Sequence, residues 1–86
     1  MSYAVEILRS ARKQLERIAA ESQERILVAL EALADMPRPE GCTKLSGRDA
    51  WRLRIGEYRV VYEIDDAGKR VVIVVVAHRR DAYRPR

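Results

Sequence analysis

The sequence predicts a small α+β domain in which two helices cover one face of a single twisted, mainly antiparallel sheet. Three observations support this prediction. Apolar residues recur at helical spacing through residues 10–36, they alternate over 50–64, and they form a continuous run, VVIVVVA, over 71–77. Eighty-six residues leave no room for a second core, so we expect one domain over residues 1–86.

The first expected element is a short strand over residues 2–8, because SYAVEIL alternates loosely and contains β-prone residues. A first helix is expected over 10–22, with Ser10 as a possible N-cap. A second helix is expected over 22–36, with Ser22 as the candidate cap. The two helices nearly abut, which predicts an αα-hairpin with a minimal turn near residues 20–22. The apolar stripes are Ala11, Leu15, Ile18 and Ala19 in the first helix, and Ile26, Ala29, Leu30, Leu33 and Ala34 in the second.

The second half of the chain predicts three consecutive strands. Residues 37–41, PRPEG, end the second helix because proline cannot continue it, and residues 38–48 form a polar loop. Strands then follow at about 50–55, 58–64 and 70–77. Gly56 and Glu57 suit a two-residue type II′ turn, in which glycine supplies the positive φ, and residues 65–69, DDAGK, form a longer turn.

The last of these strands is apolar at every position, which predicts burial on both faces and a central place in the sheet. An antiparallel meander would leave that strand at an edge unless another strand pairs with its free side. The strand over residues 2–8 is the candidate for that pairing. The expected order is therefore β-α-α-β-β-β, with both helices on one side of the sheet.

Charge is distributed unevenly along the chain. Residues 1–37 hold five basic and six acidic side chains, whereas residues 38–86 hold twelve basic and seven acidic ones. A basic half beside a neutral half indicates an anionic partner, most commonly a nucleic acid. The chain has one cysteine, Cys42, too few for an intramolecular disulfide, and no apolar run long enough to span a bilayer. We read no secretory signal at the start and expect a cytoplasmic protein.

Three guanidiniums lie on the outer face of the predicted hairpin. If Gly56 and Glu57 are the turn residues, Arg54 lies directly opposite Arg59, and Arg52 is next along the same strand. Like charges directly across a strand pair are destabilising by roughly 0.2–1 kcal/mol. A solvated face with splayed side chains is one interpretation. A fixed anion site is the other, and arginine favours it because its planar fork grips phosphate in a bidentate manner.

The basic tail, HRRDAYRPR, follows the last strand directly. Strand pairing brings either His78 or Arg79 to the arginine face, and a bulge in the preceding turn decides which of the two it is. His78 would suit acid–base work at neutral pH, or it is a surface histidine at a strand end. Tyr83 either provides a stacking platform for an unpaired base or packs on the edge of the domain.

The chain resembles RelE-type toxins of bacterial toxin–antitoxin pairs. Three segments carry the resemblance: KLSG at 44–47, WRLRIGEYRVVYEIDD at 51–66, and VVIVVVAHRRDAYR at 71–84. The combination G-[ED]-Y-R-[VIL]-[VI]-Y, a hydrophobic strand and H-R-R-x-x-Y is fairly specific. With the preceding strand and helical hairpin, the resemblance covers essentially the whole chain and implies a RelE-like fold.

The resemblance implies a metal-independent endoribonuclease that cuts messenger RNA, usually in the ribosomal A site, and thereby inhibits translation. The 2′-OH attacks the adjacent phosphate, a reaction that needs a base, cations and an acid. The family's motif positions match Arg52, Arg54, Arg59, Arg79 and Tyr83, and we take Arg54, Arg59, Arg79, Tyr83 and His78 as the candidate catalytic residues. The candidate RNA-binding residues are Arg52, Lys44, Arg80 and Arg84. A cognate antitoxin is the implied protein partner.

The chain departs from the family pattern at Arg52 and Arg54, which are lysines in the best-known members, one of them the proposed general base. A guanidinium stays protonated and is a poor base, so that role falls on Tyr83 or His78, or is weakly filled. The alternative reading is a ParE-like toxin of the same fold that inhibits DNA gyrase by binding, without RNA cleavage. A third is a non-catalytic RNA-binding or structural domain.

Other chemistries find no support in the sequence. One histidine and one cysteine do not assemble a typical structural zinc site, and no P-loop or dinucleotide fingerprint is present. No serine occupies a nucleophile-elbow context. We therefore expect neither a metal nor another cofactor.

Overall fold

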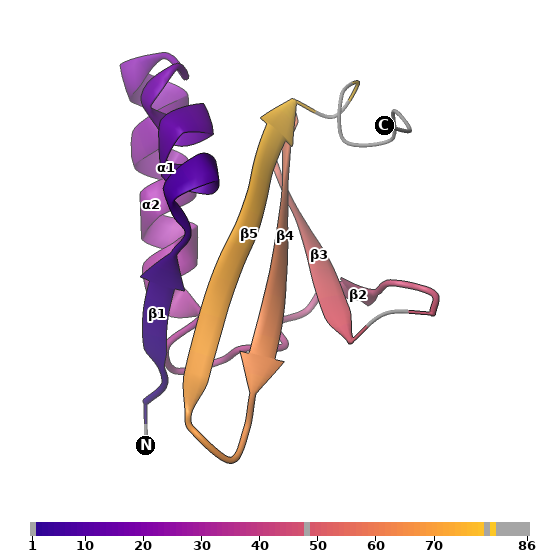
Figure 1. The fold of residues 1–86 in the computed structure, drawn as a ribbon. Coiled ribbons are helices and arrows are strands. Elements are labelled where there is room, and N and C mark those ends of the chain that lie inside the picture. The colour runs from indigo at the N-terminus through magenta and orange to yellow at the C-terminus, as the bar shows by residue number, and fades with distance from the viewer. Residues whose placement is uncertain (1, 48, 79, 81–86) are drawn as a thin grey trace.

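The computed structural model describes residues 2–47, 49–78 and 80. The described elements are β1 (Ala4–Ile7), α1 (Arg9–Glu16), α2 (Ala20–Ala32), β2 (Thr43–Lys44), β3 (Ala50–Ile55), β4 (Tyr58–Asp65) and β5 (Arg70–His78). They form one sheet in the order β1-β5-β4-β3-β2, with both helices on the same side of it (Figure 1). The predicted fold class is confirmed. The short strand β2 is an addition, within the stretch expected to be a loop.

Both helices start earlier than predicted, and the predicted N-caps are wrong. Ser10 and Ser22 lie inside the helices. The N-cap positions are occupied by Leu8 in α1 and by Ala19 in α2, and neither residue makes a side-chain capping bond. Leu8 is extended, with φ −63° and ψ 152°, so β1 passes into α1 almost directly. The turn between the helices is residues 17–19, not 20–22. Gln23 supports this junction, since its side-chain amide donates to the Leu15 carbonyl at 2.9 Å.

The hydrophobic core lies between the two helices and one face of the sheet. Each helix contributes one stripe and each long strand contributes alternate residues, as the sequence pattern predicts. Ala19 is an exception, because it is exposed at the helix junction. The buried cluster consists of Ala11, Leu15, Ile26, Leu30, Leu33, Val60, Tyr62, Val71, Ile73 and Val76.

The strand β5 occupies a central place because β1 pairs with its free side. The pairing is parallel and runs from Ala4 opposite Arg70 to Ile7 opposite Ile73. Beyond β1, the helix α1 covers the edge of β5, where the Gln14 side-chain oxygen accepts a hydrogen bond from the Val76 N–H at 2.8 Å. The sequence-based prediction of this strand neighbour is confirmed.

A register shift interrupts the pairing of β4 with β5. Val61 lies opposite Val75 and Tyr62 opposite Ile73, so Val74 is the extra residue of a β-bulge. The bulge allows residues three apart, Ile73 and Val76, to face the same core. On the other face Val75 is only partly buried, as are Val72 and Ala77. The expectation that β5 is buried on both faces is therefore wrong, because the helices cover only one face of the sheet.

Candidate functional site

The hairpin of β3 and β4 positions the candidate arginines. Gly56 has φ +61° at the turn, and Lys69 is the one described non-glycine residue with positive φ, so the turn geometry fits type II′. The pairing then runs from Ile55 opposite Tyr58 through Arg54 opposite Arg59. The predicted register of this hairpin is confirmed.

Arg52, Arg54 and Arg59 share the face of the sheet that is turned away from the helices. This follows from the register, because Trp51, Leu53 and Ile55 alternate with them and pack against the core. We call this surface the open face. Arg54 is exposed, and its Nε donates to the Gly56 carbonyl at 3.2 Å, which folds the guanidinium back toward the turn. Arg52 and Arg59 are half-buried, and both interact with other groups of the protein.

The open face is acidic at its other end. Glu63 and Asp65 lie on β4 on the same face as Arg59, four and six residues further along the strand. Together with Asp49 and Arg70 they line a hollow of about 270 Å³. Arg70 also lies 3.6 Å from the Glu6 carboxylate. An anionic ligand is therefore attracted to the turn end of the hairpin and repelled from the far end.

His78 does not join the arginines. Its strand partner is Tyr58, and residue 77, not 78, lies opposite Arg59. The Tyr58 and His78 rings meet edge to face, with centroids 5.5 Å apart and an interplanar angle of 82°. His78 Nδ1 accepts a hydrogen bond from the Arg80 N–H at 3.3 Å. The candidate acid–base histidine thus lies on the side of the sheet that faces the helices.

The structure describes two of the remaining candidates, Lys44 and Arg80, and they lie apart from the arginine pair. Lys44 pairs with Trp51 in β2, so it is placed on the helix side of the sheet edge, where it lines an open hollow with Ser46 and Asp49. Arg80 is exposed beyond the end of β5. The candidates Arg79, Tyr83 and Arg84 lie outside the described residues.

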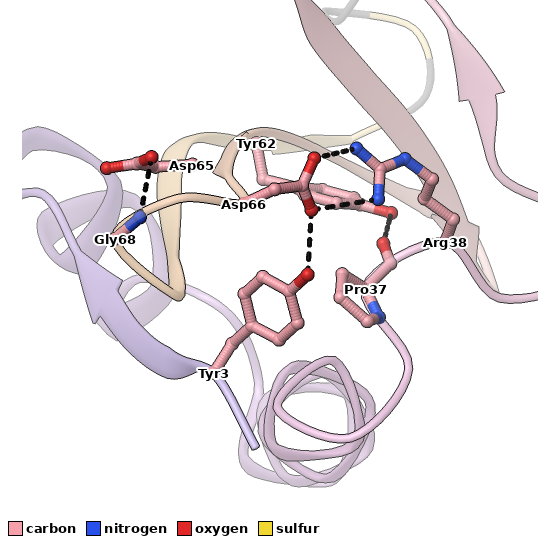
Figure 2. Close-up of polar contacts among 7 residues, drawn as sticks. All are labelled: Tyr3, Pro37, Arg38, Tyr62, Asp65, Asp66 and Gly68. Carbon is pink, nitrogen blue, oxygen red and sulfur yellow. Dashed lines mark hydrogen bonds and ion pairs between the residues drawn. The ribbon is translucent and has the colours of Figure 1, made fainter. Parts of the chain in front are cut away.

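A polar network that the sequence pattern did not reveal lies at the end of the sheet away from the turn at Gly56 (Figure 2). The Asp66 carboxylate accepts hydrogen bonds from the Tyr3 hydroxyl at 2.7 Å and from both terminal nitrogens of Arg38, at 2.9 and 3.3 Å. The Arg38 guanidinium also lies 5.1 Å from the centre of the Trp51 ring. The Tyr62 hydroxyl donates to the Pro37 carbonyl at 2.8 Å. These contacts fasten the loop after α2 to β3, β4 and β1.

Hydrogen bonds shift the pKa of Asp66 and Tyr3 in this network, and burial shifts that of Tyr62. The bond from Arg38, and then the bond from Tyr3, hold the pKa of Asp66 below its ordinary value. The bond to Asp66 raises the pKa of Tyr3. Burial raises the pKa of the Tyr62 phenol, with a further contribution from Cys42. No sequence signal marks this network, since Tyr3 and Asp66 are 63 residues apart in the chain.

Arg25 is a second residue that sequence reasoning missed. It lies on an exposed turn of α2, where an arginine is unremarkable in the sequence. In the structure its guanidinium nitrogens lie 3.5 and 3.6 Å from the point where a Cβ on Gly56 would be. Only the contact across the fold brings Arg25 to the hairpin turn.

The structure adds two findings on metals and membranes. Within residues 2–47, 49–78 and 80, no three histidine, cysteine or acidic side chains are grouped so that they could hold a metal ion. Neither helix in that part of the chain has the length and apolar character that crossing a membrane requires.

Comparisons with known proteins relate this chain to toxins of type II toxin–antitoxin systems. The family model described as "ParE toxin of type II toxin-antitoxin system, parDE" matches residues 5–83. The chain is 37% identical over 90 residues to toxin RelG of Mycobacterium tuberculosis, and the match covers 98% of this chain and 99% of RelG.

Solved structures give the same result. The archaeal RelE–RelB complex from Pyrococcus horikoshii contains a chain that superposes with a TM-score of 0.85 at 29% identity, covering 94% of this chain and 99% of that one. The toxin–antitoxin complex RelBE2 from Mycobacterium tuberculosis gives a TM-score of 0.82 at 26% identity, with coverage of 91% and 99%. This chain is therefore similar to these toxins over its whole fold.

Proposed function

Because the chain belongs to the ParE toxin family of type II toxin–antitoxin systems, within the RelE/ParE superfamily, we propose that it is a metal-independent endoribonuclease. Its substrate is messenger RNA, cut in the ribosomal A site in the cytoplasm, so that translation stops. The similarity to RelG and to RelE structures supports this proposal over most of the chain.

The observation that carries the proposal is the placement of Arg54 opposite Arg59 on the open face, with Arg52 two residues away. Like charges in this arrangement oppose folding by roughly 0.2–1 kcal/mol per pair. A local arrangement that opposes folding is expected at functional sites. A bound phosphate would offset the repulsion, since each guanidinium offers parallel N–H donors to its oxygens.

The proposed reaction is a transfer of the phosphodiester within one ribose. The 2′-OH loses its proton to a base and bonds to phosphorus, the P–O5′ bond breaks, and the leaving O5′ takes up a proton. The products are a 2′,3′-cyclic phosphate and a 5′-OH end. Arg59 and Arg79 would stabilise the additional negative charge of the phosphorane, and Arg52 and Arg54 would hold the adjacent backbone.

The acid–base role falls to Tyr83 in this proposal. A guanidinium does not give up its proton in proteins, so neither Arg52 nor Arg54 can replace a basic lysine. His78 is placed beside Tyr58 on the other face of the sheet. A phenol next to several guanidiniums is more easily ionised than a free one, which would favour proton transfer by Tyr83.

The test is induced expression with mapping of the 5′ ends of cellular mRNA. We expect codon-phased cuts for the wild type and a strong reduction in the number of cuts for Arg59→Ala. Tyr83→Phe should also cut less than the wild type. Arg12→Ala, a change on the exposed face of α1, is the matched control and should cut normally. Growth arrest by the wild type without new RNA ends would contradict the proposal.

Inhibition of DNA gyrase by binding is the second candidate function. Two observations favour it: the matching family model is that of ParE, and arginine replaces lysine at both hairpin positions. It predicts a DNA damage response on induction and inhibition of DNA supercoiling by purified gyrase. The nuclease predicts neither effect, so the two candidates separate in one induction experiment.

A cognate antitoxin is the proposed protein partner, since the structures from Pyrococcus horikoshii and Mycobacterium tuberculosis are toxin–antitoxin complexes. A mainly apolar groove of about 380 Å³ lies between α2, the loop after it, and β3. Met36 lines this groove and is 60% exposed, so its apolar side chain is accessible to a partner. We propose that an amphipathic segment of the antitoxin fills the groove, while acidic residues neutralise the arginines. The groove residues are Ala29, Ala32, Leu33, Asp35, Met36, Pro39 and Leu53.

A further inference from the structure

A second cavity lies at the tip of the β3–β4 hairpin, on the side of the helices. Its volume is about 290 Å³, and it is bounded by α2, the hairpin turn and the end of β5. The lining combines a cation, a carboxylate, a hydroxyl and two aromatic rings, contributed by Arg25, Glu57, Ser22, Tyr58 and His78. The proposed reaction centre on the open face uses none of these side chains.

Two guanidiniums meet at Gly56 from opposite faces of the hairpin. Arg54 reaches it from the open face, where its Nε donates to the Gly56 carbonyl at 3.2 Å. Arg25 reaches it from the helix face, with nitrogens 3.5 and 3.6 Å from the position of a Gly56 Cβ. Guanidiniums therefore flank the tip on both faces, and the Glu57 carboxylate lies beside Arg25 in the lining of the cavity.

The polar groups of the cavity suit an unpaired nucleobase. His78 Nδ1 accepts a hydrogen bond from the Arg80 N–H, which leaves Nε2 as the ring nitrogen that can donate to a base. Glu57 adds an acceptor of the kind that reads exocyclic amino groups, and Ser22 adds a hydroxyl. Tyr58 and His78 add ring surfaces, which are typical of sites for splayed-out RNA bases.

The size and charge of the cavity argue against other small ligands. Ligand pockets span about 300–1,000 Å³, so a cavity at the lower limit suits a single base better than a whole nucleotide cofactor. A bare phosphate inside the cavity would lie beside the Glu57 carboxylate as well as Arg25, so the cavity suits a doubly charged anion less well than a neutral group. A base is neutral and meets no such conflict, while its own phosphate stays outside the cavity, with the guanidiniums that flank the tip.

We infer that this cavity binds the base of a nucleotide next to the scissile phosphate and determines which base is preferred there. The inference rests on the proposed RNA substrate and assigns a specificity site to it. In this arrangement the RNA backbone passes over Gly56, from the arginine pair on the open face to Arg25 on the helix face. His78 then reads the base and takes no part in proton transfer.

The test uses fluorescent RNA pentamers that carry a 2′-deoxy sugar at the central position, so that they bind without being cut. Each position beside the centre is varied through the four bases. We expect the wild type to prefer one base at one position by about tenfold, which is a typical effect of a good base contact. Ser22→Ala, Arg25→Gln and His78→Gln should reduce that preference to within about twofold, whereas Arg12→Gln should leave it intact.

Two results would overturn the inference: a wild type that binds all four bases equally, or cavity variants that keep the full preference. If His78→Gln fails to fold, the NMR signals of the His78 ring in the wild type are measured instead. If these signals do not shift when the preferred pentamer is added, the inference is overturned as well. Mapped cuts in cells with a flat binding profile would reject the cavity but keep the nuclease. A base preference that depends on the cavity, without cuts, would support the cavity and reject the nuclease.

Discussion

Arg54 and Arg59 lie directly opposite each other in the strand pair β3–β4, one residue before the pair that closes the turn. Both are placed on the open face, and Arg54 is held toward the turn by its bond to the Gly56 carbonyl. The hairpin thus places two permanent cations at directly paired positions on the same face of the sheet. This arrangement opposes folding and prepares the surface for an anion, so stability and binding should respond in opposite directions to a change of charge.

We expect Arg54→Gln to raise the free energy of unfolding by roughly 0.2–1 kcal/mol, because it removes the cross-strand repulsion, whereas the lost bond to the Gly56 carbonyl is exposed to water and contributes little. The same change should weaken RNA binding and lower the salt slope of the affinity by about one, since one phosphate contact is lost. Urea denaturation and fluorescence titration at several salt concentrations measure the two effects. Arg12→Gln, which removes an exposed charge from α1, should alter neither; a destabilised Arg54→Gln would contradict the repulsion argument.

The Arg38–Asp66 contact should make stability depend on pH in the acid range. Hydrogen bonds lower the pKa of Asp66 below its ordinary value of 3.8. A carboxylate with a lowered pKa stabilises the fold above that ordinary value, and the contribution disappears as the pH falls through the folded-state pKa. Asp66→Asn should therefore melt at a lower temperature than the wild type at pH 6, with the difference shrinking below about pH 4.

Glu40→Gln is the control for that experiment, because it removes one carboxylate from the same loop as Arg38 without touching the network. Its melting temperature should follow the wild-type pH profile. If Asp66→Asn and the wild type keep a constant difference down to pH 2, the ion pair does not contribute to stability.

The Tyr62 hydroxyl gives a prediction for the alkaline range. The side chain is fully buried and its hydroxyl donates to the Pro37 carbonyl, so Tyr62→Phe should cost about 1 kcal/mol near neutral pH. Burial raises the phenol's pKa above 10.0, so its contribution is complete below that pH and is lost as the pH rises. Chemical denaturation between pH 7 and 11 should show that the free energy of unfolding falls more steeply with pH for the wild type than for Tyr62→Phe. Tyr3→Phe, whose hydroxyl is exposed, should cost less at neutral pH.

Gly56 has a φ of +61°, which an L side chain adopts at a cost of about 1–2 kcal/mol. We expect Gly56→Ala to lose that amount of stability, measured by thermal and urea denaturation. A Cβ would stand in ordinary contact with the Arg25 guanidinium, so backbone conformation, and not crowding, should dominate the loss. A chemically synthesised chain with D-alanine at position 56 is the matched control, since a D-residue favours positive φ and should retain the stability.

Met36 tests the proposed antitoxin groove. Because it is 60% exposed and lines the groove, Met36→Asp should weaken antitoxin binding by tenfold or more and leave the free toxin folded. Val28 is 61% exposed on α2 but does not line the groove, so Val28→Asp is the matched control. Isothermal titration of each variant with the purified antitoxin measures the effect. Equal affinities for the two variants would place the antitoxin elsewhere.

The fold and the hairpin register could be predicted because each rests on a local pattern. Alternation around Gly56 determines which side chains pair, and a strand that is apolar throughout requires neighbours on both sides. The starts of the helices were harder to predict from the sequence. The two serines that suggested caps lie within helices, and Leu8 and Ala19, which precede the helices, carry no capping group.

The location of His78 could not be predicted because it depends on one extra residue in β5. The bulge at Val74 lies in a uniform run of valines and isoleucine, where no glycine or polar residue marks it. The network around Asp66 and the approach of Arg25 to Gly56 were missed for a related reason. They join elements far apart in the chain, and periodicity carries no information about such contacts.

The parallel pairing of β1 with β5 has a consequence for how the chain folds. Within the part of the chain that the structure describes, residues 4–7 pair with residues 70–73 alone, so β1 can join the sheet only after more than sixty intervening residues have been synthesised. Contacts of such high sequence separation slow folding, since loop closure must precede any gain from pairing. During translation, the nascent chain therefore emerges from the exit tunnel with α1 and α2 available before the strand that completes their shared core. A growing toxin is thus expected to remain inactive until that strand has left the ribosome.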